Sequence, residues 1–167
     1  TSYLERELGI PHKLLPQIAK FYKKEEIDKH EFLVEKGNLC NKLCFIESGY
    51  WRFFTYSEKK AVTHWIFGAN QIITDMASFY LREDAKWNIQ ALSKTQVYTL
   101  DHSDFQLMRT AIPEWDAFEK QLMIKLLSAM ENRVYALLSM TAEERYKYLY
   151  TSDRRMFQEL PLNYLAS

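Results

Sequence analysis

The side chains that could bind a metal or act as nucleophiles are few and scattered. Cys40 and Cys44, in the sequence CNKLC, are the two cysteines. An iron–sulfur cluster needs four cysteine ligands, and this spacing lacks the second ligand pair of a structural zinc site. We therefore expect two reduced structural thiols. The histidines stand far apart, at positions 12, 30, 64 and 102. The sequence predicts no catalytic residues, no metal site and no enzymatic activity.

The composition is that of a chain with a sizeable core. Of its 167 residues, 47% are hydrophobic and 15% are aromatic, and 22 Lys and Arg balance 22 Asp and Glu. This balance gives no sign of a nucleic-acid or membrane partner recognised by net charge. No apolar run is long enough to span a bilayer, and no signal peptide is visible. We therefore expect a cytoplasmic protein without a membrane partner.

Short strands are expected between residues 23 and 101, after a helical segment at 3–22 that is interrupted at Gly9-Ile10-Pro11. The clearest strand runs are 42–47, 50–56, 61–67, 87–92 and 97–101, with turns at Gly37-Asn38, Ser48-Gly49 and Gly68-Ala69-Asn70 and a helical patch at 74–80. Short strands separated by such turns are typical of an antiparallel barrel or sandwich. Aromatic residues inside a small barrel usually form its core.

A small barrel also occurs in cupin enzymes, which hold a metal through clustered His and Glu side chains on adjacent strands. The barrel region of this chain offers only His30 and His64, without a His-x-His pair. The cupin alternative therefore lacks its ligands, and metal retained through purification would be the observation that favours it.

Residues 102–150 are expected to be helical, with a short helix from His102 and a long one from Pro113. Large apolar residues recur every three or four positions along the long helix: Trp115, Phe118, Leu122, Leu126, Met130, Val134 and Leu137. Such a stripe on a helix of about 40 Å packs either on a second copy of the chain or back on its own barrel. We favour the first reading and predict a homodimer with these seven residues at the interface.

The last residues restart an apolar helical pattern. Pro161 suits the first position of a helix, and Leu162, Leu165 and Ala166 would then share one face. One or two turns alone bury too little to be stable. We therefore expect a further element to complete this helix.

The order of these elements resembles the Crp/Fnr family of bacterial transcription regulators, in the form found in Bacteroidetes-like lineages. The resemblance rests on EFLVEKGNLCNKLCFIESGYWRFF, with turns at Gly37 and Gly49, and on NQIITDMASFY, NIQALSKTQVYTLDHSDFQLM, ERYKYLY and LPLNYLAS. It implies an α+β fold with an N-terminal helix, an antiparallel β-roll or jelly-roll sensor domain, a long dimerisation helix and the start of a winged helix-turn-helix. The implied domains are a cyclic-nucleotide-binding-like domain at 1–110, the helix at 111–139 and a partial DNA-binding domain at 140–167.

The resemblance also implies where an effector would bind. Members that bind cyclic nucleotides use a Gly-Glu helix start and a following Arg-Ser/Thr-Ala, which hold the phosphate through backbone N–H groups and an arginine. Here these positions read Thr74-Asp75 and Ala85-Lys86-Trp87, so the arginine is missing. Arg82 and Lys86 either replace it or are solvated loop charges. Asp75 could accept a hydrogen bond from a hydroxyl of the effector, but more simply it caps or solvates a helix start. Thr74, Asp75, Arg82, Lys86 and Trp87 are the candidate ligand-binding residues, but we expect no cyclic nucleotide to bind; no cofactor is assigned and the effector is unknown.

The implied function is regulation of transcription by a dimer that binds DNA. The second helix of a helix-turn-helix reads the bases, and the resemblance implies that this recognition helix is the element we expect to complete the last helical pattern. The alternative is a stand-alone ligand-binding or protein-interaction module that has lost DNA binding. A recognition helix encoded after Ser167 would separate the two.

Overall fold

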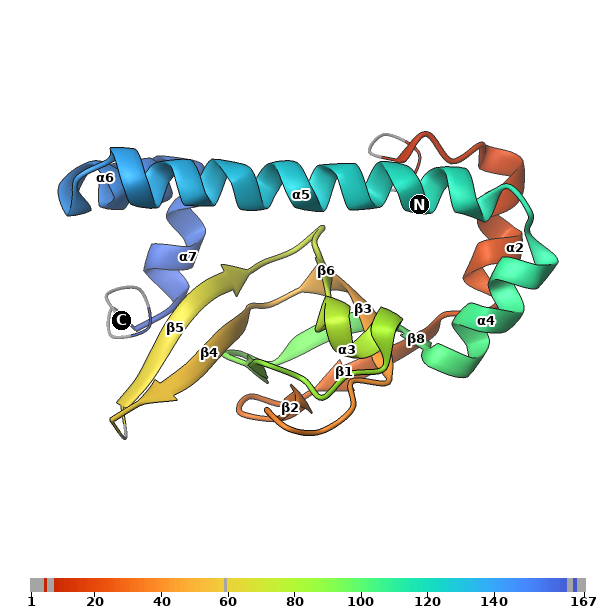
Figure 1. Ribbon diagram of the computed structural model, residues 1–167, viewed down its shortest axis with the longest axis horizontal. Coiled ribbons are helices and arrows are strands. Elements are labelled where there is room, and N and C mark those ends of the chain that lie inside the picture. Colours follow the sequence, from red (N-terminus) through yellow and green to blue (C-terminus); the bar gives the residue numbers. More distant parts are fainter. Residues whose placement is uncertain (1–4, 6–7, 59, 162–163, 165–167) are drawn as a thin grey trace.

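The computed structural model of the protein describes residues 5, 8–58, 60–161 and 164, and shows a β-roll with a long helix along one side (Figure 1). Its elements are η1 (His12–Leu14), α2 (Leu15–Ala19), β1 (Lys23–Ile27), β2 (Phe32–Val34), β3 (Lys42–Ser48), β4 (Trp51–Ser57), β5 (Lys60–Phe67), β6 (Ile72–Ile73), α3 (Met76–Leu81), β7 (Asn88–Ala91), β8 (Thr95–Asp101), α4 (His102–Ala111), α5 (Trp115–Ser139), α6 (Ala142–Ser152) and α7 (Arg154–Glu159).

Two four-stranded antiparallel sheets form the roll. One has the strand order β1-β8-β3-β6 and the other β2-β7-β4-β5. Strands that are neighbours in the sequence lie in different sheets, except for β4 and β5, which pair from Trp51 opposite Phe67 to Ser57 opposite Lys60. The interior between the sheets is therefore lined by residues from both. The expected α+β class, with an antiparallel roll and a long helix, is confirmed.

Gly49, between β3 and β4, occupies a position that only glycine fits. Its φ is +92°, in the region that side chains disfavour. A Cβ atom there would lie 2.7 Å from Thr95 Cβ and 2.8 Å from the Lys94 carbonyl oxygen. The turn predicted at Ser48-Gly49 is thus set by a left-handed backbone and by close approach of the β7–β8 turn.

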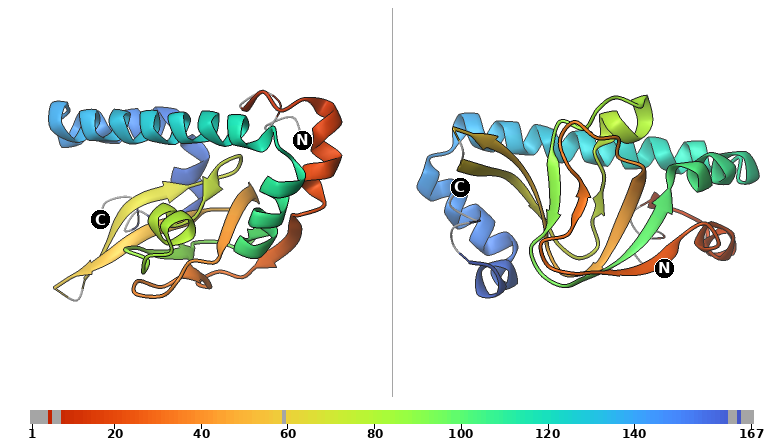
Figure 2. Two further views of the ribbon diagram at one scale, coloured as in Figure 1. Left: turned by 45° about the vertical axis from the view of Figure 1, so that its right-hand side comes forward. Right: turned by 90° about the horizontal axis from the view of Figure 1, so that it is seen from below.

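The apolar core has a cluster inside the roll and a second one under the helices. The first joins strands of both sheets and includes the fully buried Ile46, Trp51 and Ile89. The second packs α2, α4 and the first half of α5 against one end of the roll, around Ile18, Phe105 and Leu122. Figure 2 shows these helices gathered at that end, while the rest of α5 continues along the side of the roll.

The last helices fold back toward the roll. Thr141 and Glu144 form a capping box at the start of α6, because each side chain accepts the backbone N–H of the other, at 3.3 and 2.7 Å. In α7, Met156 is buried against Tyr50 and Leu92 of the roll. Leu162, Leu165 and Ala166, expected to share a helix face, lie outside the described residues, and the helix-turn-helix stays a prediction.

Candidate functional site

Buried polar residues form the start of α3. Thr74, Asp75 and Ser78 are exposed by only 4%, 3% and 0%. Asp75 is the N-cap: its backbone is extended, with φ −81° and ψ 107°, and its Oδ1 accepts a hydrogen bond from the N–H of Ser78 at 3.1 Å. An aspartate at this position accepts one of the N–H groups that the first turn of a helix leaves unpaired. The expected capping role of Asp75 is therefore confirmed.

The second oxygen of Asp75 joins α3 to the segment before β7. Oδ2 accepts the backbone N–H of Lys86 at 2.9 Å and that of Trp87 at 3.4 Å. The structure thus brings Asp75 together with two residues that the sequence suggested for the same site. Lys86 and Trp87 contribute backbone donors at this point, and one carboxylate collects N–H groups from two separate segments.

The hydroxyls of Thr74 and Ser78 tie the same helix start to β3 and the loop before it. Thr74 Oγ1 donates to the Lys42 carbonyl at 2.9 Å, and Ser78 Oγ accepts the N–H of Cys40 at 2.7 Å. Buried polar groups are costly unless they are paired. This network meets that condition, and it fixes α3, the 85–87 segment and β3 relative to one another.

Aromatic side chains fill the interior beside this network. The Trp87 ring lies 6.5 Å from Phe53 and 4.7 Å from the His64 ring, measured between centroids. Phe53 in turn lies 4.7 Å from Phe67, and Trp51 is 1% exposed. Trp51, Phe53, Phe67 and Trp87 therefore belong to the core of the roll, as the sequence suggested for its aromatic residues, whereas Tyr56 of β4 is 65% exposed.

Residues 24–110, from β1 to α4, match the protein-family model described as the cyclic nucleotide-binding domain. The match includes both sheets of the roll and the α3 network. The chain belongs to the cyclic nucleotide-binding domain family. No curated protein matches the sequence at a significant level.

Solved structures share the fold of this cyclic nucleotide-binding domain. The catabolite activator protein of Thermus thermophilus has 16% identity and a TM-score of 0.66, over 81% of this chain and 61% of that one. A CooA mutant from Carboxydothermus hydrogenoformans has 20% identity and a TM-score of 0.60, over 89% of this chain and 64% of that one. The N-terminal domain of a Streptomyces coelicolor transcriptional regulator has 15% identity and a TM-score of 0.64, over 78% of this chain and 94% of that domain. The chain spans about three fifths of the Thermus protein's length.

The two candidate cations of this cyclic nucleotide-binding domain point away from the α3 network. Arg82 Nη2 donates to Asn41 Oδ1 at 2.6 Å, and Lys86 Nζ lies 3.8 Å from Glu83 Oε2. Both side chains lie at the surface, in the loop after α3. In the part of the chain that the structure describes, neither side chain contacts Asp75, so the structure does not bring these cations together with Thr74 and Asp75.

The cysteines lie beside the network as buried thiols without a disulfide. Cys40 Sγ lies 3.4 Å from Thr74 Oγ1, and Cys44 Sγ lies 3.9 Å from Thr99 Oγ1. Burial raises the pKa of the Cys44 thiol to about 12. Over the described part of the chain, no three His, Cys, Asp or Glu side chains converge as a metal site would require. None of the described helices is long and apolar enough to cross a membrane.

The apolar stripe expected to form the dimer interface divides between two faces of α5. Trp115 and Leu122 are buried in the protomer's own core, and Phe118 and Leu126 pack against it. Met130, Val134 and Leu137 are exposed by 61%, 52% and 54%. Each step of four residues advances about 40° around a helix, so a stripe with repeated four-residue steps drifts from one face to the other. The expectation that all seven residues face a partner is therefore corrected for the first four.

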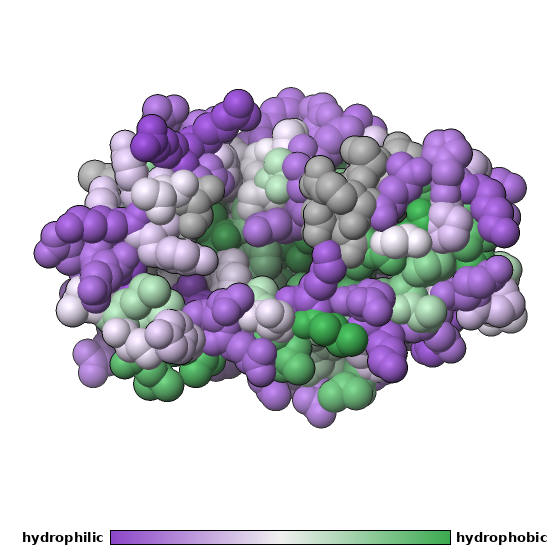
Figure 3. All heavy atoms as spheres, turned by 90° about the horizontal axis from the view of Figure 1, so that it is seen from above, coloured by the Kyte–Doolittle hydropathy of each residue, from purple (hydrophilic) through white to green (hydrophobic). Residues whose placement is uncertain are grey.

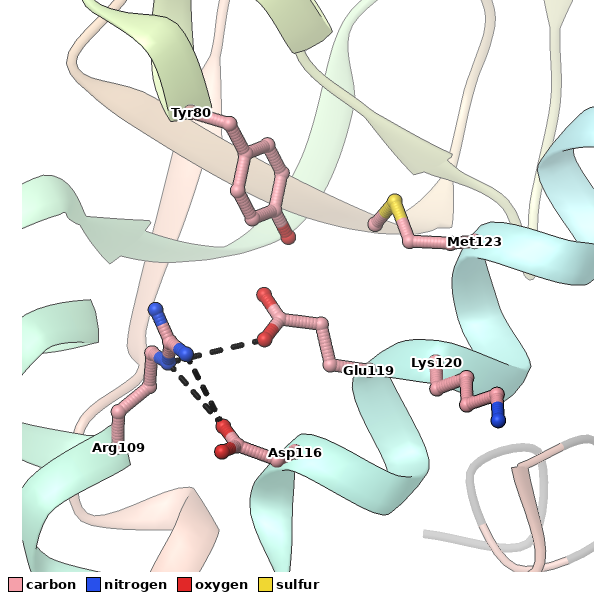
Figure 4. A pocket seen from close by; sticks show the side chains of 6 residues that line it. All are labelled: Tyr80, Arg109, Asp116, Glu119, Lys120 and Met123. Atoms are coloured by element: carbon pink, nitrogen blue, oxygen red, sulfur yellow. Dashed lines mark hydrogen bonds and ion pairs between the residues drawn. The ribbon is translucent and has the colours of Figure 1, made fainter.

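A hollow of about 350 Å³ lies where α3, α4 and α5 meet (Figure 4). Arg109 on α4 pairs there with Asp116 at 3.1 Å and with Glu119 at 3.7 Å, which joins α4 to α5. The Tyr80 hydroxyl points toward the Glu119 carboxyl. Burial is the main cause that raises the pKa of Glu119. Arg109, Asp116 and Glu119 thus hold α4 and α5 together.

Two features of the site were missed at the level of sequence. Ser78 had no expected role, although its place three residues after a helix cap puts it in the first turn. The backbone N–H groups of Lys86 and Trp87 left no signal either, because a main-chain donor is the same for every residue but proline.

Proposed function

We propose that this chain is the sensor part of a transcription regulator of the Crp/Fnr type, which binds DNA as a homodimer in response to an effector. The proposal assigns it no catalytic activity and a cytoplasmic location. Support comes from the family match of the roll and from its similarity to the structures of a catabolite activator protein and of a transcriptional regulator's N-terminal domain.

The observation that carries the proposal is an exposed apolar face on the second half of α5. The face begins at Ile124, just before the middle of the helix. Its members recur at alternating steps of three and four residues, with the acidic Glu131 among the apolar Ile124, Leu127, Val134 and Leu138. Leu127 is 60% exposed and Leu138 is 82% exposed. This spacing averages 3.5 residues, which is the repeat of a two-helix coiled coil. A second copy of the same helix fits such a face.

The surface around this face is otherwise mostly hydrophilic. Figure 3 views the molecule from the side on which α5 lies and shows hydrophobic groups set among hydrophilic ones. A shallow groove runs along the end of α5, lined by Leu127, Met130, Glu131, Val134, Tyr135, Leu138 and Ser139. Exposed apolar patches rimmed by polar residues mark interaction sites. A parallel helix pair would bury this groove in both copies.

Contacts between the roll and the C-terminal half of α5 give the proposed regulator a route from sensor to helix. The Arg133 guanidinium lies over the Trp65 ring of β5 at 4.7 Å. The neighbouring His64 contacts the Trp87 ring, and Trp87 donates its N–H to Asp75. An effector would act by binding one arrangement of roll and helix more tightly than another.

DNA binding is tested on the full-length product of the gene. We expect mobility shifts with duplexes that contain two-fold symmetric half-sites about 34 Å apart, one helical turn. We also expect weaker binding when the half-site spacing is changed by half a turn. A dimer that shifts no duplex from a randomised symmetric pool would favour the alternative of a ligand-binding or protein-interaction module.

A further inference from the structure

The Asp75 carboxylate lies in a concave arrangement of backbone donors. The N–H of Ser78 reaches Oδ1 at 3.1 Å, and those of Lys86 and Trp87 reach Oδ2 at 2.9 and 3.4 Å. The residue is 3% exposed. Consecutive main-chain N–H groups that point at one spot form an anion-binding concavity. In this protein a side chain of the chain itself supplies the anion.

The surroundings of Asp75 are fixed on several sides. The segment that carries the donors is paired with the loop before β3, because Gly37 N donates to the Ala85 carbonyl and Ala85 N donates to the Asn38 carbonyl, both at 2.9 Å. Asn88, which follows Trp87, accepts the N–H of Lys36 at 3.1 Å and donates to the Phe54 carbonyl at 3.3 Å. The donors therefore cannot turn away from Asp75 without breaking this pairing.

Cations that could neutralise a second anion are not directed at this spot. Among the described residues, the side chain of Arg82 pairs with Asn41 and that of Lys86 with Glu83, both at the surface. A phosphate brought next to Asp75 would compete for the same N–H groups and would meet a like charge at close range. An incoming phosphate would therefore have to displace an internal carboxylate without a paired cation to help it.

We infer that Asp75 is a built-in anion that fills the anion-binding position of the roll and excludes effectors that present a phosphate there. Asp75 is thus a specificity-determining residue, and an effector of this sensor would be uncharged or cationic at that point. The inference rests on the proposed function only in treating the roll as the sensor. Its test needs neither DNA nor a dimer, so the two proposals can fail separately.

The first experiment adds millimolar cyclic AMP or inorganic phosphate to the protein and records its thermal unfolding, with sodium chloride at matched ionic strength as the reference. We expect no change in Tm for the unmodified protein. We expect Asp75→Ala to unfold at a lower temperature, since it loses the cap and leaves buried donors unpaired. Inorganic phosphate should raise the Tm of this variant by several degrees, because the emptied position can take an anion.

Matched variants separate the charge of Asp75 from its place in the chain. Asp84→Ala, at an exposed aspartate in the same loop, should behave like the unmodified protein in both solutions. Asp75→Ser keeps a capping side chain but removes the charge, and it takes the place of Asp75→Ala if that variant does not fold. The inference would be overturned if cyclic AMP or phosphate raised the Tm of the unmodified protein. It would also be overturned if phosphate raised the Tm of neither Asp75 variant.

Amide hydrogen exchange gives a readout that needs no variant. In the unmodified protein the N–H groups of Lys86 and Trp87 should exchange slowly, because Asp75 already accepts them. Their exchange should not slow further when phosphate is added. Fast exchange that phosphate slows would show that the position is open to external anions, and the inference would be wrong.

Discussion

The two halves of α5 have similar apolar content but opposite surroundings. In the first half, Trp115 and Leu122 are buried against α4 and the end of the roll. In the second half, Leu127 and Leu138 stand in the solvent. The first half therefore belongs to the core of one protomer, while the second offers a face to another molecule. The apolar residues of one helix can face both the protomer's own core and another molecule when their repeat differs from that of the helix.

Glu119 in the first half and Glu131 in the second are acidic residues set among apolar neighbours. Glu119 lies on the inner side, near the Tyr80 hydroxyl and in contact with Arg109. Glu131 lies in the exposed heptad face. Glu119 is partly buried in the protomer, whereas Glu131 would be buried only in a dimer. The two residues therefore give matched probes of what each half packs against.

Charges placed in the exposed face should have the largest effect on association. Leu127→Glu together with Val134→Glu should weaken a dimer by about 100-fold or more, since each buried aliphatic side chain contributes roughly 1.5–3 kcal/mol and two copies are affected. Sedimentation velocity over a concentration series measures this. Gln121→Glu with Asn132→Glu adds the same charge at exposed positions outside the heptad face and should leave the dimer intact. Equal loss in both double variants would show that charge alone, and not this face, controls assembly.

Truncation in the inner half should affect the folding of the protomer. Leu122→Ala is expected to lower the free energy of unfolding by about 2–5 kcal/mol, because it removes a buried side chain and leaves a cavity. The matched change Leu127→Ala, at a residue 60% exposed, should cost less than about 0.5 kcal/mol in the monomer. Urea unfolding, at a protein concentration too low for the dimer to form, measures the free energy of unfolding of both variants. Similar losses for the two variants would contradict the division of α5.

Replacing the acid of the exposed face should strengthen the dimer. A polar residue at one core position of a coiled coil sets the register at a cost in stability. Glu131→Leu is therefore expected to tighten association by about tenfold or more, as measured by fluorescence anisotropy of a labelled protomer. Weaker association would mean that Glu131 is paired with a cation across the interface. The two helices would then be aligned in a register different from the one proposed.

The inner acid should produce a small pH effect. Burial raises the pKa of Glu119 above its ordinary value of 4.5, so the folded state holds the proton more tightly than the unfolded chain. Its contribution to stability is therefore most favourable at low pH and is lost as the pH rises through the raised pKa. The Tm of Glu119→Gln relative to that of the unmodified protein should rise by about 2 °C between about pH 4.5 and pH 8.

The exposed Glu114→Gln serves as the control for this measurement and should show no such trend. A Tm difference for Glu119→Gln that falls with rising pH would instead mean that the charged carboxylate stabilises the folded helix pair.

Local patterns in the sequence predicted most of the fold. The turn at Gly49 needs the positive φ that glycine adopts without strain, and the predicted strand at 61–67 agrees with β5, Lys60–Phe67, within one residue. The capping role of Asp75 was also visible, because an aspartate before a helical patch accepts an N–H within its own turn. These features depend on neighbours in the sequence, so reading the chain was sufficient.

Long-range contacts decided the rest. The sequence determined that Thr74, Asp75 and Trp87 are candidates for one site, through a family resemblance, and that α5 is a long apolar helix. Only the tertiary structure decided that the Asp75 carboxylate accepts the backbone donors of Lys86 and Trp87, eleven and twelve residues away in the chain. It also decided which part of α5 is buried. Both outcomes depend on how the roll, α3 and α5 pack together, and side-chain types at fixed spacings do not encode the direction in which a helix face or a main-chain donor finally points.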